Sequence, residues 1–332
     1  MEKLKFVRKK IKIKIPSRLH MSLMDVQRLQ RGQIGGGGIG IAINRNLIIT
    51  LEVIESDSDE IVSNKSELIR YSLNIMRDKL HICEHFKVEC SFDSAIIPHS
   101  GMGSNALIQT GTMYGINCMY GSKISIEKLI DIMHENYCEE EEGIIKRKVF
   151  CSGVAHNTFL RGGICFVDEL GKFIYNYKLP ENYKIILMKS VIGDVFNLED
   201  DKRDETIIQL RKENDNNYFE QKNRIIRNEI IPELKLNNYR ILADKMRKFA
   251  LEDDTNFMIK NCKIGRIKYE ELYQDIKDIP NLIMGVSGNA PLAYVISDKW
   301  ERVLEICKKY DINASVYEIQ NDGASIIEEV WV

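Results

Sequence analysis

The sequence predicts a mixed fold in two domains, α+β with α/β as the alternative, and three observations lead to this prediction. Runs rich in β-branched residues and segments with helical spacing follow one another along the whole chain. The chain has 332 residues, enough for two domains that each have a hydrophobic core. The pattern breaks at residues 168–171 and 180–182. We therefore predict one domain at residues 1–175 and another at residues 176–332.

The predicted elements follow the hydrophobic pattern in chain order. Strands are predicted at residues 4–15, 39–53, 85–92, 162–168, 183–188, 281–286 and 313–319. Helices are predicted at residues 64–79, 104–114, 125–137, 200–211, 216–234, 239–251 and 299–310. Asn64 is placed to cap the first of these helices, with Glu67 three residues further on. The acidic run at residues 139–142 predicts a solvated loop.

Composition and charge argue against several functional classes. Apolar residues make up 44% of the chain and charged residues 29%, which is typical of a globular protein. The net charge is −2, so we expect no nucleic-acid partner. No apolar run is long enough to cross a membrane, and the basic start lacks the apolar core of a signal peptide. The eight scattered cysteines predict reduced thiols and a cytoplasmic protein.

The segment at residues 98–104, Pro-His-Ser-Gly-Met-Gly-Ser, stands directly before a predicted helix. Pro98 stiffens the entry, and Ser104 can cap the helix. Gly101 and Gly103 permit positive φ angles and the close approach of a ligand to the backbone. The free N–H groups and the dipole at a helix start favour an anion. The segment therefore predicts a phosphate or pyrophosphate cradle, with a tight turn and a simple helix cap as the alternative.

Three further motifs accompany this segment in a fixed order. Residues 16–20 read Pro-Ser-Arg-Leu-His and are followed by Asp25 and a glycine run. Residues 151–163 read Cys-Ser-Gly-Val-Ala-His-Asn-Thr-Phe-Leu-Arg-Gly-Gly, and residues 285–294 read Gly-Val-Ser-Gly-Asn-Ala-Pro-Leu-Ala-Tyr. Together with residues 98–104, they resemble the motifs of the GHMP kinase superfamily. Within it they look most like the β-ribofuranosylaminobenzene 5′-phosphate synthases and their C-nucleoside-forming relatives.

This resemblance implies both a fold and an activity. The implied fold is α+β, with a ribosomal-S5-like N-terminal domain and a ferredoxin-like C-terminal domain. The implied activity is a phosphoribosyl transfer that forms a C–C bond. In it, 5-phosphoribosyl 1-diphosphate loses pyrophosphate, and the acceptor, an aromatic or heteroaromatic acid, loses CO2. We expect Mg²⁺ to take up charge on the leaving pyrophosphate, no organic cofactor, and a homodimer. Asn105, His156 and Asn157 are larger or more polar than the family's residues, which indicates a different acceptor.

The resemblance also implies site residues. The expected catalytic residues are Arg18, His20 and Asp25, and Asp25 is also the expected Mg²⁺ ligand. The expected substrate- and phosphate-binding residues are Ser17, Gly36, Gly37, His99, Ser100, Gly101, Gly103, Ser104, Asn105, His156, Arg161 and Ser287. Arg18 and His20 are two residues apart, so in an extended segment they share one side. The alternatives are a surface ion pair for Arg18 and Arg161, a satisfied buried histidine for His20, a turn for Asp25, and a mobile hairpin loop for the glycine run.

Two departures from the kinase motifs favour the transferase. The kinases place an aspartate where this chain has Ala155, and a methyl group neither accepts a proton nor holds a hydroxyl in line. Their third motif is dense in glycine, whereas this chain has Pro291 and only Gly285 and Gly288 there. An ATP-dependent small-molecule kinase, with Asp25 as the substitute acid, is the alternative. A non-catalytic ligand sensor is the second alternative.

Overall fold

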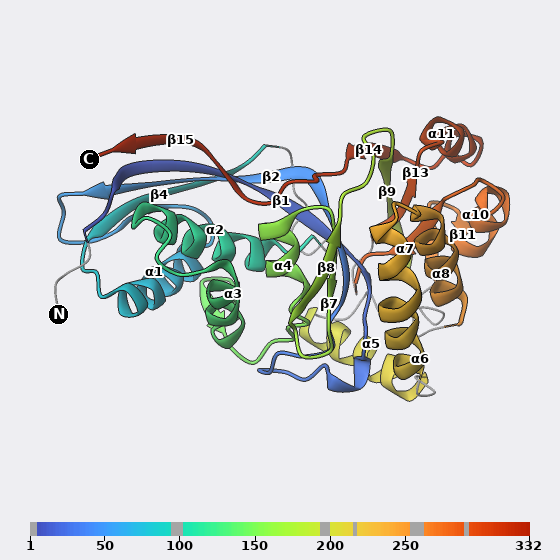
Figure 1. Ribbon diagram of the computed structural model, residues 1–332, viewed down its shortest axis with the longest axis horizontal. Coiled ribbons are helices and arrows are strands. Elements are labelled where there is room, and N and C mark those ends of the chain that lie inside the picture. The colour runs from blue at the N-terminus through green and yellow to red at the C-terminus, as the bar shows by residue number, and fades with distance from the viewer. Residues whose placement is uncertain (1–4, 94–101, 193–199, 215–217, 253–261, 289–291) are drawn as a thin grey trace.

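The computed structural model describes residues 5–93, 102–192, 200–214, 218–252, 262–288 and 292–332. They form two large, mainly antiparallel sheets with helices packed on them, as Figure 1 shows. The predicted α+β class is confirmed. All eight cysteines are free thiols. Within these described ranges, no helix combines the length and the apolar character needed to span a membrane.

The first sheet has the order β15-β1-β2-β4-β3, and β7 and β8 extend it beside β2. Its strands are β1 (Arg8–Ser22), β2 (Gly38–Ile54), β3 (Glu60–Val62), β4 (His85–Phe92), β7 (Ile164–Val167), β8 (Phe173–Tyr177) and β15 (Ser325–Trp331). The helices beneath it in Figure 1 are α1 (Ser66–Leu80), α2 (Ser104–Met119), α3 (Ile126–Glu135) and α4 (Val154–Arg161). A separate hairpin joins β5 (Glu139–Glu141) and β6 (Ile144–Lys146).

The helix α2 lies close to the first sheet because two of its glycines face strands. A Cβ on Gly111 would lie 2.8 Å from the Ile15 side chain, and one on Gly115 would lie 2.4 Å from Leu51. Real Cβ atoms do not approach neighbours so closely, so a larger residue at either position would push the helix away from the sheet. This packing fixes where α2 begins.

The start of α1 differs from the prediction. Its cap residue is Lys65 rather than Asn64, and no side chain of the helix makes a capping hydrogen bond. The carboxylate of Glu140 instead accepts a hydrogen bond from the Leu68 backbone N–H at 2.7 Å. Glu140 is only 2% exposed. The acidic run at residues 139–142 is therefore not a solvated loop, because one of its carboxylates satisfies a buried helix start.

The second sheet has the order β11-β10-β9-β13-β12, with β14 also paired to β9. Its strands are β9 (Lys184–Ile192), β10 (Cys262–Ile264), β11 (Ile267–Lys268), β12 (Ile283–Val286), β13 (Leu292–Ser297) and β14 (Ala314–Glu318). Its helices are α5 (Asp200–Asn214), α6 (Tyr218–Ile225), α7 (Ile231–Lys235), α8 (Tyr239–Glu252), α10 (Tyr269–Ile276) and α11 (Trp300–Lys309).

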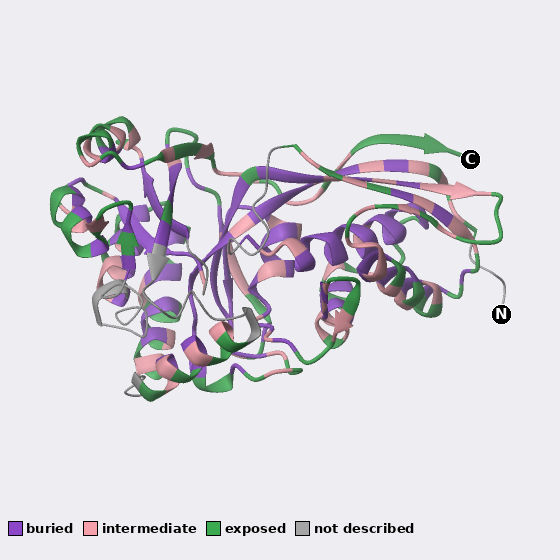
Figure 2. Ribbon diagram, turned by 180° about the vertical axis from the view of Figure 1, so that it is seen from behind, coloured by how far each residue is buried: buried purple, intermediate pink, exposed green. Residues whose placement is uncertain are grey.

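The strands β1 and β2 are long enough to take part in two hydrophobic cores. Ile13 and Ile49 pack in a core with residues of α1 and α2. Further along, Leu19 and Ile41 pack with Ile185 of β9 and with residues of the α6–α8 region. Figure 2 shows that both strands are buried along most of their length. Shared strands therefore hold the two sheets together.

The strands do not divide the chain at the predicted boundary. Residues 175 and 176 lie inside β8, which belongs to the first sheet. The chain then forms the second sheet, and β15 returns to pair with β1 from Arg8↔Trp331 to Lys14↔Ser325. The division into residues 1–175 and 176–332 stays a prediction.

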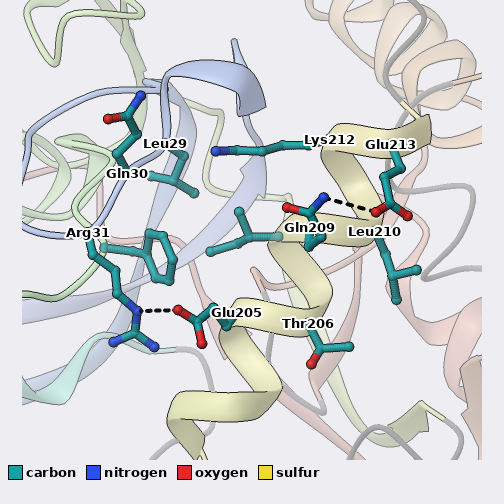
Figure 3. A pocket seen from close by; sticks show the side chains of 11 residues that line it. Leu29, Gln30, Arg31, Glu205, Thr206, Gln209, Leu210, Lys212 and Glu213 are labelled. Carbon is teal, nitrogen blue, oxygen red and sulfur yellow. Dashed lines mark hydrogen bonds and ion pairs between the residues drawn. The ribbon is translucent and has the colours of Figure 1, made fainter.

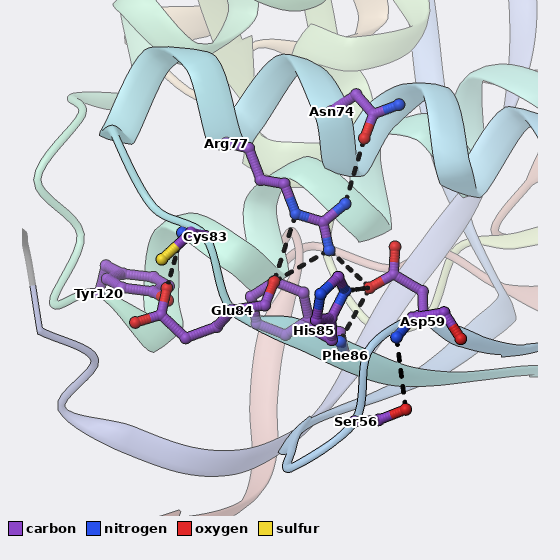
Figure 4. Close-up of polar contacts among 10 residues, drawn as sticks. Ser56, Asp59, Asn74, Arg77, Cys83, Glu84, His85, Phe86 and Tyr120 are labelled. Atoms are coloured by element: carbon purple, nitrogen blue, oxygen red, sulfur yellow. Dashed lines mark hydrogen bonds and ion pairs between the residues drawn. The ribbon is translucent and has the colours of Figure 1, made fainter.

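A cluster of charged side chains joins β4 to α1 and to the loop before β3 (Figure 4). The Asp59 carboxylate accepts hydrogen bonds from Arg77 at 2.5 Å and from the Phe86 backbone N–H at 2.9 Å, and it lies 3.6 Å from His85 Nδ1. Arg77 also donates to the Glu84 carbonyl at 2.9 Å. Burial acts to raise the pKa of Asp59, but the hydrogen bonds from Arg77 and Phe86 outweigh it, so the pKa is lowered. We call these residues the Asp59 cluster.

Candidate active site between the two sheets

Arg18 lies on β1 against the start of α2. The helix begins at Ser104, directly after Gly103, whose φ is +75°. A Cβ on Gly103 would lie 3.4 Å from the Arg18 guanidinium and 3.3 Å from the Phe159 ring of α4. Arg18 is half-buried, its Nε is shielded from solvent, and burial lowers its pKa. A cation and the positive end of a helix therefore lie side by side, an arrangement that an anion between them would stabilise.

His20 connects β1 to both α4 and the second sheet. Its backbone N–H donates to Ser287 Oγ at 3.0 Å, and its carbonyl accepts from the Gly288 N–H at 3.2 Å. Its ring Nε2 lies 3.5 Å from Ser152 Oγ, which in turn accepts from the Val154 N–H at the start of α4 at 3.4 Å. We call this meeting point of residues from three parts of the chain the joint.

The position of α4 beside the joint depends on Gly40. Gly40 pairs with His20 across β1 and β2. A Cβ on Gly40 would lie 2.5 Å from Thr158 Oγ1 and 2.6 Å from the Val154 side chain. Because only a glycine leaves room for the helix here, α4 packs directly on β2 and brings Ser152 next to His20.

Two buried cations that the sequence analysis missed also point toward the end of β1. Lys222 of α6 is 2% exposed, and its ammonium donates to the Leu23 carbonyl at 2.9 Å and lies 3.5 Å from Ser22 Oγ. Arg211 of α5 is 3% exposed and donates to the Gly288 carbonyl at 3.0 Å. Both lie in polar helical stretches, so no sequence signal marks them out.

The glycine run packs against backbone. Gly36 has a φ of +94°, its N–H donates to the Glu169 carbonyl at 3.0 Å, and its own carbonyl accepts from Asp25 N–H at 2.8 Å. A Cβ on Gly37, whose φ is +55°, would lie 2.0 Å from the Asp168 carbonyl oxygen. These glycines are buried and hold two loops together. A Cβ on Gly38, the last glycine of the run, would lie 3.3 Å from the His20 ring.

Asp25 is 2% exposed, and its carboxylate has local partners. One oxygen accepts from the Gln27 N–H at 2.9 Å and so caps the short 3-10 helix Val26–Arg28, and the other lies 3.3 Å from Arg28 Nε. Across the part of the chain that the structure describes, no three His, Cys, Asp or Glu side chains are grouped so that they could hold a metal ion. Because Mg²⁺ is commonly held by one or two carboxylates together with substrate phosphates, Asp25 as a Mg²⁺ ligand stays a prediction.

The remaining predicted residues are spread around α2 and α4. Ser17 is fully buried, and its hydroxyl has no hydrogen-bond partner among the described residues. Asn105, in the first turn of α2, accepts from the Glu140 N–H at 3.4 Å. Arg161, at the end of α4, pairs with Glu127 at 3.1 Å, so it has the surface ion pair that was its alternative. His99, Ser100 and Gly101 lie outside the described residues.

His156 faces the interior beneath α2. Thr110 Oγ1 donates to the Ala106 carbonyl at 2.6 Å, so it accepts from His156 Nδ1 at 2.8 Å. The ring lies 5.3 Å from the His134 ring. Burial lowers the pKa of His134 to about 4 and that of His156 well below its usual value. Both histidines are therefore neutral at pH 7. The expected role of His156 in substrate binding stays a prediction.

Figure 3 shows a pocket that is lined by residues of α5. Its volume is about 720 Å³, and it lies between α5 and residues 29–31. An ion pair of 3.3 Å between Arg31 and Glu205 crosses it, and Gln209 donates to Glu213 at 2.9 Å along its wall. No residue expected in the site lines this pocket. The predicted site and this pocket are separate features.

The joint thus lies where the two sheets meet: His20 of β1 bonds to Ser287 and Gly288 after β12, and Arg211 of α5 donates to the Gly288 carbonyl. Solved structures share this architecture. A homoserine kinase from Cytophaga hutchinsonii matches with a TM-score of 0.60 at 14% identity, covering 98% of this chain and 99% of its own. A mevalonate pyrophosphate decarboxylase from Streptococcus pyogenes matches with a TM-score of 0.63 at 12% identity, covering 94% and 97%.

A mevalonate kinase from Methanococcus jannaschii matches with a TM-score of 0.58 at 16% identity, covering 93% of this chain and 98% of its own. No family model and no curated protein matches the chain. The chain therefore has the fold of the GHMP superfamily, as the sequence motifs predicted. At these identities the likeness establishes the fold alone.

Proposed function

We propose that this protein is a phosphoribosyltransferase that joins 5-phosphoribosyl 1-diphosphate to an aromatic or heteroaromatic acid through a C–C bond. One observation carries the proposal. The first turn of α4, where the kinase motif has an aspartate, holds Ala155 beside the joint. Without a carboxylate there, no side chain at that position can accept a proton from a substrate hydroxyl. Lys222 instead donates to the Leu23 carbonyl directly after β1, and Arg211 donates to the Gly288 carbonyl at the joint. Arg18 lies on β1, two residues before His20.

The charges support an anionic donor substrate. A leaving diphosphate accumulates negative charge as its bond to the sugar breaks, and fixed cations and N–H groups stabilise that charge. Arg18 beside the start of α2 is placed to supply both kinds of group. Shielding from solvent strengthens these interactions, because the local dielectric constant is lower than in water.

The proposed reaction exchanges a C–O bond for a C–C bond. The bond between the anomeric carbon and the diphosphate oxygen breaks, and its electron pair leaves with the pyrophosphate. The ring carbon that carries the carboxylate attacks the anomeric carbon with a π-electron pair. The bond to the carboxylate carbon then breaks, CO2 leaves, and the electron pair restores the aromatic ring. No external oxidant or reductant is needed, and the residues serve to position and stabilise charge.

The test is release of pyrophosphate and CO2 from 5-phosphoribosyl 1-diphosphate, with Mg²⁺ present and a panel of aromatic acids. We expect Arg18→Gln to lower pyrophosphate release by about a hundredfold, as when one charge-stabilising donor is removed from an active site. Lys14→Gln is the matched control, because it removes the same charge from a half-buried position on the same strand. We expect it to stay within about twofold of the wild type. Equal losses in both variants would contradict the assignment of Arg18.

The kinase remains a second candidate, because homoserine kinase and mevalonate kinase share the fold. It predicts ADP formation from ATP and a small alcohol, with loss of that activity in Asp25→Asn. The capped, ion-paired carboxylate of Asp25 is a poor general base, which is why we rank the kinase second. ADP formation in place of pyrophosphate release would overturn the transferase. Ligand binding without turnover of either substrate would indicate a sensor.

A further inference from the structure

Arg211 is buried with little to compensate its charge. Among the described residues its side chain makes one hydrogen bond, from the guanidinium to the Gly288 carbonyl at 3.0 Å. Its Nε has no hydrogen-bond partner, and no carboxylate pairs with it among the described residues. A guanidinium offers five N–H donors, and a buried charge costs free energy unless it is paired and hydrogen-bonded. Arg211 is therefore incompletely satisfied in the protein alone.

The packing of α5 fixes where Arg211 points. Ile207, one turn earlier on the same face, is fully buried in the core of the second sheet. Ile208 packs with Leu23 and Val26, which follow β1. The helix is thus held between the end of β1 and the second sheet. The hydrogen bond to Gly288 then directs the guanidinium to the turn that also binds His20.

We propose that Arg211 is an oxyanion-binding residue, which α5 contributes to the joint. The guanidinium is planar and matches a carboxylate or a phosphate group through two parallel hydrogen bonds. Such a ligand supplies the missing acceptor for Nε and the missing negative charge. This inference rests on the proposed function only for the identity of the anion, which is either the carboxylate of the aromatic acid or a phosphate group of the donor.

Binding measurements on the full chain test this inference without requiring turnover. Inorganic pyrophosphate and benzoate are titrated separately into wild-type protein, Arg211→Gln and Lys212→Gln by calorimetry. Lys212 is the matched control, because it is the next residue on the same helix and lines the separate pocket of Figure 3. We expect Arg211→Gln to bind one probe at least about tenfold more weakly, as for the loss of a charged hydrogen bond. We expect Lys212→Gln to stay within about twofold.

The two probes distinguish the source of the anion. Loss of benzoate binding alone assigns Arg211 to the acceptor carboxylate, and loss of pyrophosphate binding assigns it to the donor. Arg211→Lys keeps the charge but lacks the planar fork, so we expect an intermediate affinity, and it serves as the test variant where the glutamine variant does not fold. The inference is overturned if wild-type protein binds neither probe, if Arg211→Gln binds both normally, or if Lys212→Gln loses as much.

Thermal unfolding separates this role from a structural one. Replacing an incompletely paired buried charge by an apolar side chain of similar length removes its desolvation cost. We therefore expect Arg211→Met to melt at or above the wild-type temperature, by roughly 2–4 °C, while losing the probe. A lower melting temperature would show that Arg211 holds the fold and would overturn the inference. Absence of pyrophosphate release with every acid would overturn the proposed function but leave the binding result standing.

Discussion

The Asp59 cluster and the joint both bury charge, but they satisfy it differently. In the Asp59 cluster a carboxylate faces a guanidinium at 2.5 Å and a backbone N–H at 2.9 Å. At the joint, Arg211 faces a single neutral carbonyl. The Asp59 carboxylate has charged and backbone donors within the protein, whereas the Arg211 guanidinium has no anionic partner among the described residues. The comparison teaches that how well a buried charge is paired, and not burial itself, separates groups that hold the fold from groups that await a ligand.

The strongest test of this contrast removes Asp59. Asp59→Ala leaves Arg77 and the Phe86 N–H without their acceptor, and we expect a loss of about 3 kcal/mol in the free energy of unfolding. Catalytic activity of the folded fraction should not change, because the cluster lies away from the joint. Urea unfolding measures the loss, with Asp57→Ala, an exposed carboxylate in the same loop, as the control. A stability loss below about 0.5 kcal/mol would mean that the cluster contributes no more than an ordinary exposed side chain.

A substitution at Gly103 should lower activity, whereas the substitution at Asp59 should lower stability. Gly103→Val forces a β-branched residue into a positive φ and against the Arg18 guanidinium. We expect pyrophosphate release to fall by at least about a hundredfold, because the displaced donors include those that meet the leaving group. Gly143→Val is the control, since its φ is +79° but nothing lies within 4 Å of its Cβ position. Comparable losses in both variants would trace the effect to backbone strain alone.

His134 and His156 lie close together and, unlike the charged Asp59 cluster, are uncharged at pH 7, so we expect them to make the stability of the fold depend on pH. The pKa of His134 is lowered to about 4, with burial as the largest cause, then Asp131 raising it and Lys172 lowering it. Because an unfolded histidine titrates near pH 6.5, the unfolded state binds the proton more tightly. Stability is thus complete above about pH 6.5 and is lost as the pH falls toward 4, by about 2 kcal/mol at pH 5.

Unfolding free energies at pH 7.5 and pH 5 measure this loss. His134→Gln should flatten the acid slope, and His81→Asn, a change at an exposed histidine, should leave it unchanged. An unchanged slope in His134→Gln would mean that another group controls acid stability.

The sequence predicted the positions of several helices and strands better than it predicted the contacts between distant residues at the joint. The strand at residues 85–92 and the start of α2 at Ser104 were found because glycine, serine and the apolar spacing are local signals. The helix α4 was missed, since its eight residues include Val154, Thr158 and Phe159, which are weak helix formers. It is a helix because Gly40, more than a hundred positions earlier, leaves room for it. Tertiary packing overrode propensity there.

The residues of the candidate site also show that local sequence signals do not reveal contacts between distant parts of the chain. Arg18, His20, Gly103 and Ser287 were found through ordered motifs, and the structure places His20 against Ser287 and Arg18 against Gly103. Burial of Arg211 depends on side chains distant in the sequence, so a polar helical pattern could not reveal it. The expected roles of individual site residues stay predictions.

The pairing of β1 with β15 also has a consequence for synthesis. Arg8 and Glu329 form an ion pair at 2.5 Å across a separation of 321 residues. On a ribosome that adds roughly 5–20 residues per second, the outer edge of β1 waits on the order of 15–60 s for its partner. An unpaired strand edge invites association with other chains during that interval. The lysines at alternate positions of β1, residues 10, 12 and 14, give the nascent edge a charge that keeps it apart from its own copies.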